Sequence, residues 1–349
     1  VLGGLSGHHG GLRHLFQGLW HDLLHPELGQ GQGQAGVPQE REHLLQLLLG
    51  GLLQYQLNQG AEGHLLAVVH AVGLGLLGGS YAMGLTDAGY TVTAVDVRPE
   101  AIRYALEKGI IAAGAVEDFA SLLAGADAVV LGLYPHALVD WLRNNQKHLK
   151  PGALLTDVCG VKSGVVEEIQ GFLRPDAEFI ASHPMAGKEV SGVEHADCAI
   201  FKPANFIIVP TEKNTPRGLA FARGLAETLG FAHIAQLTCA EHDKMIGYVS
   251  QLTHAIAVSL MNANDNTHLA EYTGDSFRDL TRIAKINENL WSELFFLNKE
   301  NLIAEIDQFS ASLEGLKRAL VENDETELKR LFVQSTARRR LFDKKREAR

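Results

Sequence analysis

Short apolar runs alternate with helical stretches along residues 65–236. Strands are predicted at 65–72, 91–95, 128–133, 153–157, 178–182 and 206–210, which are rich in apolar and β-branched residues. Helices are predicted between them, for example at 78–88 and 99–108. Strands that alternate with helices build a mainly parallel sheet covered on both faces. The pattern therefore predicts a doubly wound α/β domain.

After about residue 237 the strand pattern stops and long helical patterns replace it. Helices are predicted at 241–264, 275–286, 289–320 and 325–345, where apolar residues recur three or four positions apart. We expect residues 237–349 to form an all-helical domain. Its apolar stripes can pack within one chain or against a second subunit, and domains of this kind often dimerise. A homodimer through the C-terminal helices is the expected assembly.

Residues 1–64 differ in composition from the rest of the chain. They are rich in Gly, Leu, Gln and His and contain neither Lys nor Ile. This is more typical of a shifted reading frame or an overextended start than of a selected domain, although a helical period at 12–23 leaves a genuine extension open. We expect an atypical extension, disordered or non-native, that the function does not require. His70 fits this view, since a buried parallel strand ordinarily carries β-branched residues.

Charge and cysteine content narrow the range of partners. A formal charge of −10 argues against a nucleic-acid partner, because such proteins usually carry a basic face. No apolar run reaches the roughly 18 residues of a membrane-spanning helix. Cys159, Cys198 and Cys239 have neither paired nor metal-ligand spacing. We expect a cytoplasmic protein with no metal site and no membrane or nucleic-acid partner.

The strongest local motif is Gly73-Leu74-Gly75-Leu76-Leu77-Gly78, between a predicted strand and a predicted helix. The three glycines permit a tight turn, close approach of a pyrophosphate and close packing of helix on strand. The helix N-terminus supplies N–H groups to the phosphates. Asp96 ends the next strand about 20 residues on, where a carboxylate accepts ribose hydroxyls. These features predict a Rossmann-like dinucleotide-binding domain.

The residues around Asp96 favour NAD as the cofactor. A carboxylate at this position would repel the 2′-phosphate of NADP. Arg98 could accept that phosphate, or it could be a solvated residue at a helix start, so NADP stays open as the alternative.

A second motif, Ser182-His183-Pro184-Met185-Ala186-Gly187-Lys188-Glu189, follows a predicted strand on the side where ligands bind in open α/β sheets. A histidine there can take a proton from a substrate hydroxyl as hydride leaves the same carbon. From spacing alone, His183 could also be a structural loop residue.

Three motifs in order resemble the prephenate and arogenate dehydrogenase family. They are Val72-Gly-Leu-Gly-Leu-Leu-Gly-Gly-Ser80, His183-Pro-Met-Ala-Gly187 and Asp279-Leu-Thr-Arg-Ile-Ala284. The resemblance runs from about residue 65 to residue 331. It implies oxidative decarboxylation of prephenate or arogenate with hydride transfer to NAD, giving 4-hydroxyphenylpyruvate or tyrosine, with no metal.

The resemblance also implies roles for single residues. His183 is implied to bind the ring hydroxyl and accept its proton, and Arg282 to bind a substrate carboxylate. The other implied substrate contacts are His254, Gln251, Trp291 and Glu189, the last as a partner of Arg282. Pro135, Asp157 and Cys159 are assigned to the cofactor site. From the residues alone, Arg282 could be an exposed helix residue, His254 and Trp291 core residues, and Glu189 a cap.

The chain departs from the family pattern at two positions. Many members have a serine just before the Val-Lys pair, where this chain has Gly160, so a hydroxyl contact is lost or passes to Cys159. The family histidine three residues before His254 is Gln251 here. Both changes affect how the substrate is placed.

Two other functions compete with this interpretation. A β-hydroxyacid dehydrogenase also joins a nucleotide-binding domain to helices, and Lys244 or Lys285 could then be the base. A non-catalytic, dinucleotide-responsive binding protein would need neither His183 nor Arg282.

Overall fold

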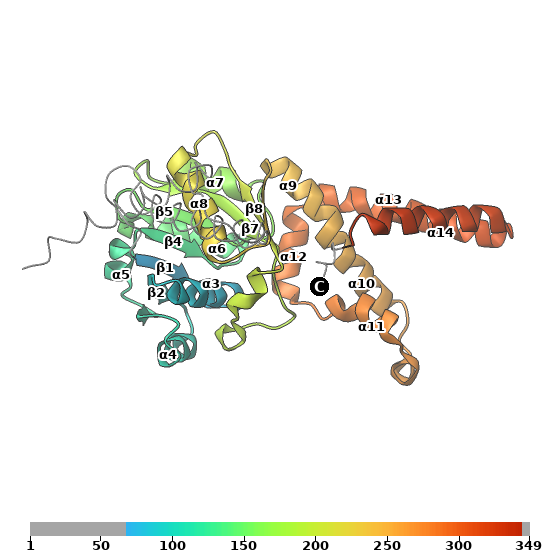
Figure 1. Ribbon diagram of the computed structural model, residues 1–349, viewed down its shortest axis with the longest axis horizontal. Coiled ribbons are helices and arrows are strands. Elements are labelled where there is room, and N and C mark those ends of the chain that lie inside the picture. Colours follow the sequence, from blue (N-terminus) through green and yellow to red (C-terminus); the bar gives the residue numbers. More distant parts are fainter. Residues whose placement is uncertain (1–67, 344–349) are drawn as a thin grey trace, which may run out of the picture. The chain divides into compact units, whose positions relative to one another are not determined.

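A six-stranded sheet with the strand order β3-β2-β1-β4-β5-β6 organises the first half of the described chain (Figure 1). All neighbouring strands in it are parallel. The structure is a computed structural model that describes residues 68–343. The order reverses between β1 and β4, which is the switch point of a doubly wound fold, where ligands bind beyond the carboxyl ends of the strands.

The elements follow the chain in the expected alternation. The strands are β1 (Val68–Val72), β2 (Thr91–Val95), β3 (Ala113–Ala115), β4 (Ala128–Leu131), β5 (Leu154–Asp157), β6 (Glu178–Phe179), β7 (Ala181–Pro184), β8 (Asn205–Val209) and β9 (His233–Gln236). The helices among them are α3 (Leu76–Asp87), α4 (Pro99–Glu107), α5 (Ala120–Gly125), α6 (Pro135–Asn145), α7 (Val165–Phe172) and α8 (Pro216–Thr228). The C-terminal helices are α9 (Cys239–Ile246), α10 (Thr253–Asn262), α11 (Asp275–Thr281), α12 (Glu288–Leu297), α13 (Lys299–Val321) and α14 (Glu325–Arg340).

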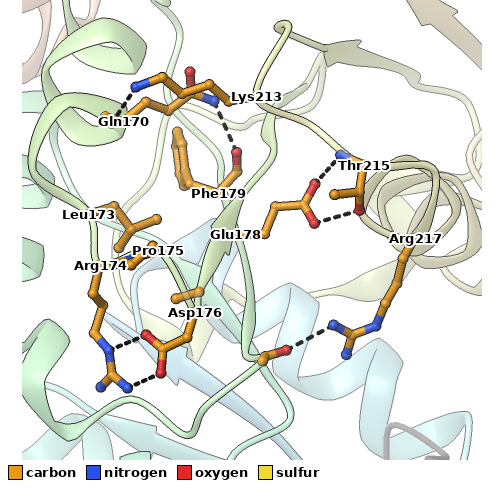
Figure 2. A pocket seen from close by; sticks show the side chains of 12 residues that line it. Gln170, Leu173, Arg174, Pro175, Asp176, Glu178, Phe179, Lys213, Thr215 and Arg217 are labelled. Atoms are coloured by element: carbon orange, nitrogen blue, oxygen red, sulfur yellow. Dashed lines mark hydrogen bonds and ion pairs between the residues drawn. The ribbon is translucent and has the colours of Figure 1, made fainter.

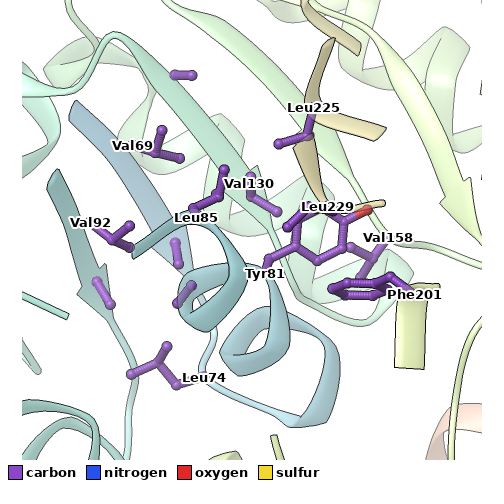
Figure 3. Packing of buried hydrophobic residues seen from close by; sticks show 14 of the residues in the cluster. Val69, Leu74, Tyr81, Leu85, Val92, Val130, Val158, Phe201, Leu225 and Leu229 are labelled. Carbon is purple, nitrogen blue, oxygen red and sulfur yellow. The ribbon is translucent and has the colours of Figure 1, made fainter. Parts of the chain in front are cut away.

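Alternating side chains of the parallel strands build a hydrophobic layer on each face of the sheet. On one face, Val69 of β1 packs with Tyr81 and Leu85 of α3 and with Leu225 of α8 (Figure 3). On the other, Val72 and Leu131 belong to a cluster with Leu138 and Leu142 of α6 and Ile169 of α7. Each fully buried side chain of this kind contributes about 1.5–3 kcal/mol. The sheet is therefore covered on both faces, as the sequence predicts.

The predicted single strand at 178–182 is wrong. The chain changes sheets at Ile180, so that β6 pairs with β5 whereas β7 pairs antiparallel with β8. A second sheet, β7-β8-β9, results, with β8 and β9 parallel. Alternation fixes which face a residue occupies but not which strand it pairs with. Two short strands were also missed, β3 because it contains only Ala and Gly, and β9 because it begins with His233 and ends with Gln236.

Two predicted helices are interrupted. The helix expected at 241–264 contains a π-helical segment, Gly247–Leu252, between α9 and α10. The helix expected at 289–320 breaks at the buried Asn298, between α12 and α13. The Asn298 amide donates to the Asp243 carbonyl and to Gln251 Oε1, both at 2.8 Å. The apolar period continues across this break, so the pattern alone could not locate it.

Some sequence predictions lie outside the described residues. These are the extension at 1–64, the start of the first strand at 65–67 and the end of the last helix at 344–345. Over residues 68–343, none of the helices has the length and apolar character needed to span a membrane.

His70 places an imidazole inside the central strand of the sheet. Its side chain is fully buried, with Nδ1 2.7 Å from Thr93 Oγ1 on β2. Its Nε2 has no hydrogen-bond partner among residues 68–343. Burial lowers the pKa of His70 from 6.5 to about 4, so the ring is neutral at pH 7. The strand therefore contains one unsatisfied buried nitrogen, which usually costs about 1–3 kcal/mol.

Replacing His70 and Thr93 together by Val should stabilise the protein, because it removes both members of the polar pair and leaves no orphaned atom. We expect the free energy of unfolding at pH 7 to rise by about 1 kcal/mol. The pKa of His70 is about 4 in the folded protein and 6.5 in its ordinary state, so the unfolded chain binds the proton first as the pH falls. The free energy of unfolding of the wild type should therefore fall as the pH drops from 6.5 to about 4, and it should fall less in the double variant. Denaturant unfolding at pH 7 and pH 5 measures both effects.

The single variant Thr93→Val is the matched control for this experiment. It keeps the imidazole and should therefore keep the pH dependence while losing stability. An equally steep loss of stability between pH 7 and pH 5 in wild type and double variant would show that His70 is not a buried neutral histidine.

Candidate active site

The turn between β1 and α3 has room for a pyrophosphate. Gly73 has a φ of +84°, and its N–H donates to the Val95 carbonyl at 2.8 Å. A Cβ on Gly78 would lie 1.9 Å from the Gly73 carbonyl oxygen, so only glycine allows this packing of helix on strand. A Cβ on Gly75 would meet nothing within 4 Å. The backbone at the start of α3 is thus open to a ligand, and a dinucleotide fits there.

The remaining residues of the glycine motif hold α3 against the sheet. Leu76 is buried, and Leu77 packs against the core while its N–H lies in the first turn of the helix. Gly75 is the N-cap and no side chain caps the helix. The first N–H groups of α3 are therefore left for an anion.

Asp96 and Arg98, which follow β2, form hydrogen bonds with this turn. Asp96 is 7% exposed and accepts the N–H of Leu74 at 2.6 Å through Oδ2 and that of Arg98 at 2.8 Å through Oδ1. The Arg98 guanidinium donates to the Leu74 carbonyl at 3.2 Å and pairs with Asp96 at 3.4 Å. The carboxylate at this edge thus has a cation beside it, at the place where a ribose is expected.

A buried ion pair lies between the end of β5 and the start of β7. Lys162 is fully buried, and its Nζ donates to Asp157 Oδ2 at 2.5 Å and to the Ser182 carbonyl at 2.6 Å. Asp157 also accepts the N–H groups of Ser182 at 2.9 Å and Cys159 at 3.0 Å. Burying two charges is tolerated when their hydrogen bonds are satisfied in this way. The network fixes the backbone immediately before His183.

Three residues assigned to the cofactor site take structural positions. Asp157 is 1% exposed and engaged with Lys162. The Cys159 thiol is buried and donates to the Leu133 carbonyl at 3.4 Å, and burial raises its pKa. Pro135 is the buried first residue of α6. None of the three presents a free polar side chain, so contact with a cofactor would be made by their backbone groups or by the Pro135 ring.

Gly160 leaves the space beside His183 without a hydroxyl group. A Cβ at this position would lie 3.5 Å from Leu294 Cδ1 and 3.9 Å from His183 Cε1. The Cys159 thiol bonds to the Leu133 carbonyl, so it does not supply the missing contact.

His183 lies half-buried on β7, at the head of a chain of polar contacts. Its Nδ1 is 2.9 Å from His242 Nε2, and His242 Nδ1 is 2.7 Å from Asp243 Oδ1. Burial, then the adjacent His242, then the charge of Lys162 hold the pKa of His183 well below 6.5. Burial likewise lowers the pKa of His242. Both rings are therefore neutral at pH 7, and a neutral imidazole can accept a proton.

Lys162, His242 and Asp243 belong to this site although the sequence predicted no role for them. Lys162 entered the family pattern only as part of the Val-Lys pair after Gly160, and none of the three motifs contained His242 or Asp243. Their positions on a loop and on α9 gave no sign that they meet His183. Only the packing of α9 against the sheet edge brings them together.

A second group of predicted residues gathers on the C-terminal helices and on the loop after β7. Arg282, in a 3-10 turn after α11, forms an ion pair with Glu189. His254 of α10 stacks on Trp291 of α12 with ring centroids 3.6 Å apart. Burial lowers the pKa of His254. The charge of Glu189 raises this pKa and the charge of Arg282 lowers it. These four residues are thus brought together.

Gln251 faces inward instead. It is 1% exposed, its amide Nε2 donates to the Leu294 carbonyl at 2.9 Å, and its Oε1 accepts from Asn298. Both of its polar atoms are engaged within the protein, so in this structure the side chain has a structural position and offers no group to a substrate.

Helix α12 connects the two groups. Leu294 borders the Gly160 position beside His183. Trp291, one helical turn earlier, stacks on His254. His183 and the group around Arg282 therefore both border α12.

A pocket of about 440 Å³ lies elsewhere, around β6 (Figure 2). Its charged side chains are paired with one another or with nearby groups, including Arg174 with Asp176 and Glu178 with Thr215. None of the residues to which the sequence assigns chemistry lines it. We therefore locate the candidate active site at His183.

Comparison with known proteins identifies the family of this chain. Residues 82–235 match the family model described as prephenate dehydrogenase, nucleotide-binding domain. Residues 238–334 match the one described as prephenate dehydrogenase, dimerization domain. Among curated proteins, a prephenate dehydrogenase of Lactococcus lactis is 30% identical over 276 residues, which cover 75% of this chain and 73% of the relative.

Solved structures give the same result. Prephenate dehydrogenase from A. aeolicus, in complex with hydroxyphenyl propionate and NAD+, is similar with a TM-score of 0.74 and 29% identity, over 81% of this chain and 100% of that one. Arogenate dehydrogenase from Synechocystis is similar with a TM-score of 0.68 and 26% identity, over 79% of this chain and 100% of that one. With both domain models matched in order along its length, this chain belongs to the prephenate dehydrogenase family.

Proposed function

We propose that this protein oxidises and decarboxylates prephenate or arogenate with hydride transfer to NAD, giving 4-hydroxyphenylpyruvate or tyrosine. The observation that carries the proposal is His183, a neutral histidine on β7, which follows the carboxyl end of β6, beside a helix that also carries Trp291. Family membership decides against a β-hydroxyacid dehydrogenase and against a non-catalytic binding protein. The A. aeolicus neighbour was solved with NAD+ and an aromatic acid.

In this mechanism His183 holds and returns one proton. Bound NAD supplies the nicotinamide that accepts hydride from the carbinol carbon. His183 Nε2 takes the hydroxyl proton as that hydride leaves, so the carbinol becomes a ketone. The ring carboxylate then leaves as carbon dioxide, and the electrons of the broken C–C bond make the ring aromatic. The protonated His183 returns its proton to the phenolate oxygen, which balances the reaction.

Arg282 is the residue we assign to a substrate carboxylate. Its side chain is 61% exposed, and its ion pair with Glu189 leaves guanidinium donors free. Glu189 orients the guanidinium, and the stacked His254 and Trp291 form a wall for the ring. The planar two-pronged donor suits a carboxylate.

The dinucleotide is held by the turn of Gly73, Gly75 and Gly78 and by the start of α3, including the backbone of Leu76 and Leu77. Asp96 is placed to meet ribose hydroxyls. Arg98 is paired with Asp96 and with the Leu74 carbonyl, so we infer NAD rather than NADP.

We infer a nucleotide-binding domain at 65–236 and a helical domain at 237–349 that forms a homodimer. Apolar side chains are exposed on α13 and α14, including Leu313 at 56% and Phe332 at 56%. Exposed apolar surface of this kind marks an interface, and the matched domain is described as a dimerization domain. A second copy of the chain is the occupant this supports.

Replacing His183 by Asn should lower kcat by roughly 100-fold or more and change KM little, because the ring nitrogen acts in the transition state. Steady-state kinetics with prephenate and arogenate measure both constants. NADH binding, followed by its fluorescence, should be unchanged. Near-normal turnover in this variant would remove His183 from the role of base.

Replacing Arg282 by Ala should raise KM strongly and lower kcat less, since a charge-assisted pair with the substrate is lost. Arg278→Ala is the matched control, because Arg278 lies on the same segment of chain, is similarly exposed and pairs with Asp275. If the two variants had the same KM, Arg282 would not bind the carboxylate.

Introducing Glu at both Leu313 and Phe332 should shift the protein from dimer to monomer, because charged side chains would be buried at the interface. Sedimentation over a range of concentrations measures the change. Ser312→Glu, also exposed and adjacent on α13, adds charge without removing an apolar contact and should weaken the dimer less. A double variant that stays dimeric would place the interface elsewhere.

A further inference from the structure

We propose that His242 and Asp243 form a positioning couple that sets the tautomer and the orientation of His183. The proposal rests on the proposed role of His183 as proton acceptor and concerns how that role is made possible. The contacts run from Asp243 through His242 to His183, and the donor in each contact can be assigned from the one before it.

Asp243, at the far end of these contacts from His183, is 1% exposed. Its Oδ1 accepts the Lys162 N–H at 2.9 Å and its Oδ2 accepts the Ser163 N–H at 2.7 Å. Backbone N–H groups can only donate, so both oxygens act as acceptors and the carboxylate cannot rotate freely. His242 Nδ1, 2.7 Å from Oδ1, therefore carries a proton and donates it to this carboxylate.

The tautomer of His242 determines that of His183. A neutral imidazole has one protonated nitrogen, so with Nδ1 protonated, His242 Nε2 is an acceptor. His183 Nδ1, 2.9 Å away, must then donate. The lone pair of His183 is consequently on Nε2, which has no hydrogen-bond partner among residues 68–343. The nitrogen left free is the one that can take the substrate proton.

The couple is itself held rigidly. His242 is fully buried in the first turn of α9, whose N-terminus carries a capping box between Thr238 and Glu241. Asp243 also receives two N–H groups from the loop that contains Lys162. The two histidine rings meet edge to face, with centroids 5.1 Å apart and planes at 61°. His183 is thus fixed from the helix as well as from its own strand.

The same contacts act when His183 is protonated. The imidazolium donates through Nδ1 to His242, and the negative charge of Asp243 lies behind it. The buried cation of Lys162 disfavours the imidazolium and lowers the pKa of His183. His242 and Asp243 do not touch the reacting atoms, so they are positioning residues, and the proton stays on His183 until it returns to the product.

The tautomer can be measured without turnover. In protein labelled with 15N-histidine, the Nε2 resonance of His183, identified by its loss in His183→Asn, should be that of an unprotonated nitrogen at pH 7. Nδ1 should be that of a protonated one. A protonated Nε2 in the wild-type holoenzyme would overturn the proposal, whatever the kinetics show.

Substitutions at His242 test the kinetic consequence. His242→Phe removes the acceptor for Nδ1–H and should lower kcat by at least about 10-fold with little change in KM. His242→Gln keeps an acceptor oxygen within reach and should restore most of the loss. His233→Gln, at an exposed histidine on β9, is the control for loss of a histidine and should be near normal.

The outcomes separate this proposal from the proposed function. If His183→Asn abolishes turnover but His242→Phe does not, His183 is the base and the positioning couple is wrong. If His183→Asn is active, the proposed function of His183 fails while the tautomer measurement still decides the couple. Equal losses in His242→Phe and His242→Gln would indicate a packing role and overturn the proposal. Should neither variant fold, the wild-type tautomer decides.

Discussion

The buried ammonium group of Lys162 is the constraint around which the site is arranged. A fully buried cation is costly unless its charge and its hydrogen bonds are satisfied, and Asp157 and the Ser182 carbonyl do so at 2.5 and 2.6 Å. The backbone N–H of the same residue donates to Asp243. Lys162 therefore connects the end of β5 and the second residue of β7, which belong to different sheets, to Asp243 of α9. Loss of either Lys162 or Asp157 would leave the charge of the other unpaired in the interior.

This arrangement gives His183 two opposing electrostatic influences. Burial, repulsion from a charge on His242 and the Lys162 cation hold the pKa of His183 low and keep the ring neutral at pH 7. His242, backed by Asp243, offers an acceptor that favours the proton once it arrives. A base must be unprotonated before the reaction and must tolerate a proton during it, and the two influences meet these two needs.

The sequence predicted best what depends on local periodicity and on short motifs. Gly73 and Gly78 are required by a positive φ and by a close approach, both of which act within one turn. Contacts over long range were not predictable. The change of sheet at Ile180 and the break at Asn298 leave the apolar pattern undisturbed, and His242 lies 59 residues from His183 along the chain. Only packing decides such features.

The two departures from the family pattern act on the same residue of α12. A Cβ at Gly160 would lie in ordinary van der Waals contact with Leu294, at 3.5 Å from its Cδ1, and 3.9 Å from His183 Cε1. Gln251, in place of a histidine, donates to the carbonyl of that same Leu294 at 2.9 Å. The amide of Gln251 thus holds α12 by a direct hydrogen bond, whereas Gly160 leaves the space between Leu294 and His183 unfilled. Trp291 lies one turn earlier on the same helix and stacks on His254, so the hydrogen bond of Gln251 anchors the helix that carries this ring.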